Sequence, residues 1–232
     1  MMSKPVPRNP DHKNSVRARI RHVLALVAAV FLLANLLQSQ GALAQTATGK
    51  SPTAIIQLFQ AIVNFPPPEW QDPDNLLQGS EMARRQSGNT FVLEFIPKGQ
   101  TFESWRQLYA VYALKSSGME LSDFVERSIV PFNQGCGEEN LKTRTVSESE
   151  ASVLVQIFCE NSAGAPKEMG YGDGVGEIAV MWFGRYRQTF VKVYQQWRGP
   201  RFSESDPETW PAKQEEIDRV FRRMALVKLA PG

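Results

Sequence analysis

Hydrophobic and polar residues follow two periods along this chain, and the first clear pattern has the period of a helix. Between residues 51 and 64, apolar side chains recur three and four positions apart, with polar side chains opposite. This spacing predicts an amphipathic helix that begins at Ser51-Pro52 and ends before Pro66-Pro67-Pro68. Its uncharged face is a candidate for docking on a partner or for peripheral contact with a membrane. Packing on its own domain is the alternative. The docking face consists of Ile55, Leu58, Phe59 and Ile62.

Most of the remaining chain has the period of a β-strand. Alternating apolar residues, separated by short polar turns, predict three β-hairpins and one further strand. Two helical patterns interrupt and close this series, at residues 121–130 and 211–227. The predicted strands span residues 80–86, 90–96, 107–115, 143–147, 152–159, 177–184 and 187–198.

Hairpins that are interrupted by one helix and closed by another predict an α+β fold. In this fold a largely antiparallel sheet has helices packed on its faces. We expect three parts along the chain. Residues 1–44 form a signal peptide, residues 45–75 an extension with the amphipathic helix and a proline-rich connector, and residues 76–230 a single α+β domain.

One succession of residues and elements carries a family resemblance. The segment Phe95-Ile96-Pro97-Lys98-Gly99-Gln100 is followed by Trp105, a strand, a helix, two hairpins and a terminal helix. This order resembles exported bacterial domains of the PsbP-like family, over residues 75–229. The resemblance implies an α/β/α sandwich, but no catalytic residue, because the functions of that family are varied.

The N-terminal residues have the order of an exported precursor. A basic stretch precedes an apolar run at residues 23–37, and small residues lead up to a cleavage site after Ala44. The run, about 15 residues long, is short against the roughly 20 that a spanning helix needs. We therefore expect a secreted, periplasmic protein. A signal that stays uncleaved and anchors the chain in the inner membrane is the alternative.

Cleavage after Ala44 changes the charge balance. The whole chain has a net charge of +2, and residues 1–44 hold six of its basic residues and one acidic residue. The remainder is therefore slightly acidic. Binding to a phosphate backbone depends on clustered Lys and Arg, so we expect no nucleic acid among the partners.

Two cysteines, Cys136 and Cys159, remain after cleavage. In an oxidising compartment such a pair most simply forms one disulfide. A reactive thiol is the alternative, but no histidine would be present to lower its pKa.

Cleavage would also remove both histidines, His12 and His22. Without imidazole no Ser-His-Asp triad, Cys-His dyad or histidine metal site can form, and we expect neither a metal nor a cofactor. The glycine-rich segment 170–177 contains Asp173 and Glu177, whose oxygens could bind calcium. It lacks the ligand spacing of a calcium loop, and we interpret it as a connection between hairpins.

Aromatic residues interleaved with basic ones suggest a surface for glycan, lipid or peptide. A buried core for the aromatic residues and a solvated strand face for the basic ones are the alternatives. The candidate ligand or partner surface consists of Trp105, Tyr186, Arg187, Lys192 and Tyr194.

These observations favour a non-catalytic binding or accessory module of the bacterial cell envelope, with an envelope protein or envelope polymer as its partner. The alternative is a hydrolase of envelope glycan that uses two carboxylates and no histidine, with Glu94 and Glu103 as the first candidates. A third class, a small-molecule carrier, would have an apolar pocket beside the sheet.

Overall fold

The structure is a computed structural model that describes residues 43–45, 53–71 and 78–232. The described residues belong to one compact unit. The predicted signal peptide, except for Leu43 and Ala44, and the predicted helix start at Ser51-Pro52 lie outside these ranges. No helix within the ranges is long and apolar enough to cross a membrane.

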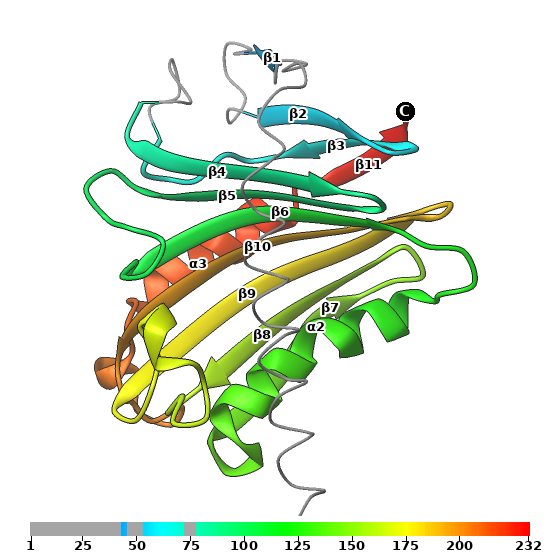
Figure 1. Cartoon of the computed structure of the whole chain (residues 1–232). Helices are drawn as coiled ribbons and strands as arrows, with labels where there is room; N and C mark the ends of the chain where they lie inside the picture. The colour runs from blue at the N-terminus through cyan, green and yellow to red at the C-terminus, as the bar shows by residue number, and fades with distance from the viewer. Residues whose placement is uncertain (1–42, 46–52, 72–77) are drawn as a thin grey trace, which may run out of the picture. The chain divides into compact units, whose positions relative to one another are not determined.

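Seven strands form the larger of two antiparallel sheets, in the spatial order β4-β5-β6-β10-β9-β8-β7 (Figure 1). Central strands such as β9 have apolar residues at consecutive positions, and nearly all of these residues are buried. Both faces of these strands are therefore covered. The strands are β4 (Ser80–Ser87), β5 (Thr90–Pro97), β6 (Gln107–Lys115), β7 (Leu141–Glu148), β8 (Ser152–Cys159), β9 (Val175–Tyr186) and β10 (Thr189–Pro200). All three predicted hairpins and the predicted strand at residues 107–115 are present.

A second, four-stranded sheet has the order β1-β2-β3-β11. It consists of β1 (Leu43–Gln45), β2 (Thr53–Leu58), β3 (Ala61–Phe65) and β11 (Lys228–Pro231). The pairing of β3 with β11, for example Val63 opposite Leu229, joins segments from the two ends of the described chain. Inward-facing side chains such as Val63 and Phe65 belong to the main hydrophobic core.

The helix predicted for residues 51–64 is wrong. Residues 53–65 form the β2–β3 hairpin, in which Leu58 pairs with Ala61 and Phe59 occupies the turn with a φ of 53°. The apolar positions fit a helix and two short strands equally well, but β-branched Ile and Val favour the strand. Because strand side chains alternate between faces, the predicted docking face is divided. Leu58 is buried in the core, whereas Ile55 and Ile62 lie on the opposite face.

Two α-helices lie on opposite faces of the seven-stranded sheet (Figure 1). Phe124 of α2 (Leu121–Cys136) packs on Phe183 and Phe190. We call this side of the sheet the α2 face. On the other side, the α3 face, α3 (Gln214–Met224) contributes Ile217 and Val220 to the core shared with the smaller sheet.

The predicted α+β fold, in which helices form the layers on the faces of a single sheet, is also wrong. The described chain is predominantly β, because residues in strands far outnumber residues in helices and form two antiparallel sheets. The layer on the α3 face includes a second sheet, whose β2–β3 hairpin was predicted to be a helix. The helix predicted for residues 121–130 continues through Pro131 to Cys136, and Gly137, with a φ of 73°, ends it.

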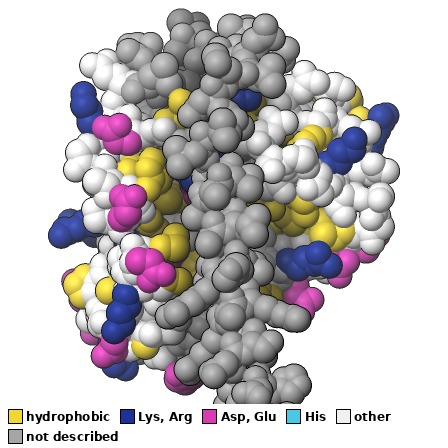
Figure 2. All heavy atoms as spheres, in the orientation of Figure 1, with side chains coloured by type: hydrophobic (Ala, Val, Ile, Leu, Met, Phe, Trp, Pro, Cys, Tyr) yellow, Lys and Arg dark blue, Asp and Glu magenta, His cyan; other side chains and the backbone are white. Residues whose placement is uncertain are grey.

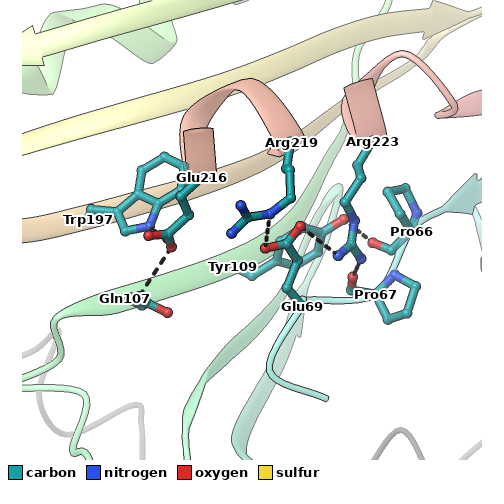
Figure 3. A network of polar contacts seen from close by, with 9 residues as sticks. All are labelled: Pro66, Pro67, Glu69, Gln107, Tyr109, Trp197, Glu216, Arg219 and Arg223. Carbon is teal, nitrogen blue, oxygen red and sulfur yellow. Dashed lines mark hydrogen bonds and ion pairs between the residues drawn. The ribbon is translucent and has the colours of Figure 1, made fainter. Parts of the chain in front are cut away.

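Polar contacts fasten α3 to the sheet (Figure 3). Trp197 Nε1 donates a hydrogen bond to Glu216 Oε1 at 2.7 Å, and Gln107 Nε2 donates to the same oxygen at 3.3 Å. The carboxylate of Glu216 therefore satisfies one donor from β10 and one from β6.

The proline-rich connector is fastened in the same region (Figure 3). The Tyr109 hydroxyl donates to the Pro66 carbonyl at 2.5 Å, and Arg223 donates to the Pro67 carbonyl. Glu69 forms ion pairs with Arg219 at 3.5 Å and Arg223 at 3.3 Å. These contacts hold the connector against β6 and α3, and they assign it a structural role.

Candidate functional site

A pocket of about 500 Å³ lies on the α2 face, and we call it the Glu177 pocket. Its walls come from the C-terminal part of α2, including Phe132, and from the loop after β8, including Ala165 and Met169. Glu177 of β9 and Gln196 of β10 contribute polar groups to it. Its size is that of a small-molecule site, and most of its lining residues are apolar or small.

The loop is held close to the helix end. Cys136 and Cys159 form the predicted disulfide, with their Cα atoms 5.6 Å apart, and both line the pocket. Gly164 donates its backbone N–H to the Gly135 carbonyl at 2.8 Å. A Cβ at Gly164 would lie 2.7 Å from the Gln134 carbonyl oxygen, so this approach of two backbones requires glycine. The disulfide and this contact fix one wall.

Glu177 is a carboxyl group with only 4% of its surface exposed. Gln196 Nε2 donates a hydrogen bond to Glu177 Oε1 at 2.6 Å. Burial raises the pKa of Glu177 from its ordinary value to about 7, although hydrogen bonds from Tyr171 and Gln196 and the charge of Arg198 oppose the rise. The carboxyl group therefore changes protonation near neutral pH.

Arg198 fastens the outer side of this region. Its guanidinium donates to the backbone carbonyls of Trp105 at 2.9 Å, Met169 at 2.6 Å and Glu103 at 3.3 Å. It also lies 4.3 Å from the ring centre of Trp105 and 4.8 Å from that of Tyr171. One buried cation thus joins two loops to the end of β10.

Lys192 lies on the same face of β10, closer to the hairpin turn. Its Nζ is 4.8 Å from the ring centre of Tyr194 and 5.4 Å from that of Tyr112. Desolvation lowers its pKa to about 8. Within the described ranges Lys192 has no ion-pair partner, and Glu94 pairs with Arg85 at 2.5 Å instead.

The structure divides the predicted ligand surface. Trp105 and Tyr194 pack in one hydrophobic cluster, and Lys192 lies over Tyr194. Tyr186 and Arg187 lie at the β9–β10 turn, at the opposite end of the hairpin from Arg198. The guanidinium carbon of Arg187 is 5.4 Å from the ring centre of Tyr186. In the view of Figures 1 and 2, α2 is in front of the sheet, and hydrophobic side chains reach the surface among charged ones.

Polar groups of the glycine-rich segment hydrogen-bond to Asn161, which follows β8. Asn161 Nδ2 donates to Asp173 Oδ1 at 3.0 Å, and the backbone N–H of Gly174 donates to Asn161 Oδ1 at 2.9 Å. These bonds close a loop between β8 and β9. No group of three or more His, Cys, Asp or Glu side chains in the described part of the chain could hold a metal ion.

The structure also separates Glu94, one of the two carboxylates predicted for a hydrolase, from the buried Glu177. Along the paired strands, Glu94 lies opposite Ala110, which lies opposite Tyr194, which lies opposite Met181. Glu177 is three strands away and four residues further along β9. At standard spacings, three strands correspond to about 14 Å across the sheet, and four residues to about 13 Å along a strand. Such a separation exceeds the roughly 5 to 9.5 Å of glycosidase pairs. Glu103 is exposed.

Sequence reasoning considered Glu177 only as a calcium ligand and did not single out Gln196. The available signal was an acidic residue at the start of the apolar run 178–183, where both faces of a central strand are buried. Its partner could not be identified, because the 19-residue separation of Glu177 and Gln196 becomes a contact only through the register of β9 and β10.

Comparison with protein-family models, with curated proteins and with solved structures finds no match to this chain. The resemblance to PsbP-like domains therefore stays a prediction.

Proposed function

We propose that this chain is an exported, periplasmic binding module of the bacterial cell envelope, and that the Glu177 pocket is its ligand-binding site. The observation that carries the proposal is the pocket itself. A concave site of about 500 Å³ has mainly apolar walls and a few polar groups held by hydrogen bonds. Sites of this kind bind small molecules or single side groups of larger partners.

The disulfide supports export, because disulfides persist in oxidising compartments. The test is cell fractionation followed by mass spectrometry of the N-terminus. Cleavage near Ala44 with the protein in the periplasm is expected. An intact Met1 terminus in the membrane fraction would contradict the periplasmic form and support the anchored one.

Blocking the pocket tests the binding site. The neutral dye Nile red is expected to bind the protein with increased fluorescence, and Ala165→Trp should weaken this binding because Ala165 lines the pocket. Ala163→Trp is the matched control, since Ala163 is exposed in the same loop and does not line the pocket. Equal dye binding by both variants would contradict the pocket as the binding site.

One observation favours the hydrolase as a second candidate. A carboxyl group with a pKa of about 7 in a pocket has the property of a general acid. The test is a zymogram on cell-wall material between pH 4 and 8, with Glu177→Gln as the control. Clearing that disappears in the variant would support hydrolysis, whereas no clearing at any pH would oppose it.

A further inference from the structure

We propose that the ligand of the Glu177 pocket is a small amine, with its ammonium group paired to Glu177 and its apolar body against the pocket walls. This assignment rests on the proposed function, since it concerns the same pocket. It follows from the charge of the lining, from the missing counterion of Glu177 and from the character of the walls.

The lining carries charge of one sign only. Among the residues that line the pocket, Glu177 and Tyr171 are the only titratable side chains, and none is Lys or Arg. The part of α2 that lines the pocket contributes no titratable group, because Cys136 is in the disulfide. Burial raises the pKa of Tyr171 above its ordinary value, so its hydroxyl stays protonated. When Glu177 is ionised, the lining therefore contributes one negative charge and no positive charge.

Glu177 has no counterion in contact with it. None of the ion pairs in the described ranges includes Glu177. Arg198 lies opposite Glu177 in the strand register, but its guanidinium donates to backbone carbonyls and lies over the rings of Trp105 and Tyr171. A buried carboxylate without a contacting cation is unfavourable. A ligand ammonium group would supply this cation.

The walls suit the rest of such a ligand. Phe132 and Ala165 are apolar, and the aromatic side chain of Tyr171 also lines the pocket. Met169 lines the pocket with 53% of its surface exposed, which places an apolar side chain at the mouth. The volume of about 500 Å³ accommodates an aromatic or short aliphatic amine.

Pairing with an ammonium group stabilises the ionised carboxylate. The charged and titratable groups that act on Glu177 are Arg198, Tyr171 and Tyr194. The two tyrosines have raised pKa values and stay neutral between pH 6 and 8, and a guanidinium group is not deprotonated in proteins. Among Glu177 and these three groups, only Glu177 titrates in this range. Amine binding should strengthen from pH 6 to pH 8 and release protons at the lower pH.

Calorimetry with three matched probes tests the proposal on the mature protein. The probes are 2-phenylethylamine, neutral 2-phenylethanol and anionic 3-phenylpropanoate. We expect the amine to bind roughly tenfold tighter than the alcohol at pH 8, as for a hydrogen bond to a charged group. This preference should shrink several-fold at pH 6, and the propanoate should not bind measurably.

Two variants separate the outcomes. Glu177→Gln should reduce the amine affinity to that of the alcohol and remove its pH dependence. Glu168→Gln changes an exposed acid in the loop after β8 and should alter neither property. If the amine and the alcohol bind equally to the unmodified protein, the amine assignment is overturned but the pocket remains a binding site. If no probe binds, both proposals are overturned.

Discussion

Gln196 Nε2 and Glu177 Oε1 lie 2.6 Å apart, joined by a hydrogen bond between neighbouring strands of the larger sheet. The bond orients a buried carboxyl group at the edge of a pocket. It also limits, but does not cancel, the effect of burial on the pKa of Glu177.

The raised pKa of Glu177 predicts a pH-dependent stability. The folded-state pKa is about 7 against an ordinary 4.5, so this group favours folding below pH 4.5 and loses that contribution as the pH rises through 7. The loss is about 3 kcal/mol. Urea denaturation should show that Glu177→Gln removes this part of the decline, whereas Glu168→Gln keeps it. If the free energy of unfolding declined equally with pH in Glu177→Gln and in the unmodified protein, the raised pKa of Glu177 would be contradicted.

Lys192 predicts the opposite trend at higher pH. Its pKa of about 8 lies below the ordinary 10.5, so the folded state loses this proton first and stability rises between pH 8 and 10.5. Replacing the partly buried cation in Lys192→Met should raise the free energy of unfolding at pH 7 by roughly 2 kcal/mol and abolish the rise. The exposed Lys98→Met is the control. A destabilised Lys192→Met would show that its contacts with Tyr112 and Tyr194 outweigh desolvation.

Arg198 should resist conservative replacement. In Arg198→Lys a single ammonium group cannot reach the carbonyls of Glu103, Trp105 and Met169 together. We expect a loss of about 2 to 3 kcal/mol in the free energy of unfolding. Arg201→Lys, at an exposed position nearby, should change it little. Equal stabilities of the two variants would contradict the bridging role.

Glu216 accepts hydrogen bonds from both Trp197 and Gln107, as shown in Figure 3. Glu216→Ala leaves the buried indole N–H without this acceptor, which should lower the free energy of unfolding by about 2 kcal/mol. Glu215→Ala changes an exposed neighbour on the same helix and should be almost neutral. Thermal unfolding followed by tryptophan fluorescence measures both, and similar midpoints would rule out this contribution.

The disulfide joins cysteines separated by 23 positions. Replacing both in Cys136→Ser/Cys159→Ser should lower the free energy of unfolding by about 3 kcal/mol. Because both residues line the Glu177 pocket, Nile red binding should also weaken. Unchanged dye binding in a folded double variant would show that the pocket wall holds without the bond.

The sequence determined the elements that depend on local patterns. The hairpins of β4–β5, β7–β8 and β9–β10 were predicted because alternating apolar residues and polar turns lie within a few positions of each other. The disulfide between Cys136 and Cys159 was predicted because two cysteines offer one pairing. The hairpins can be predicted from residues that are close in the sequence, and the disulfide from the number of cysteines.

Tertiary structure decided what depends on distant partners. The pattern of residues 53–65 fits a helix or a hairpin, and the pairing of Val63 with Leu229, at the far end of the chain, belongs to the strand alternative. In the same way, Glu177 and Gln196 meet through strand register, and residues of α2 line the same pocket. Local periodicity carries no information on which faces become buried together, because burial is a property of segments brought together only when the chain is folded.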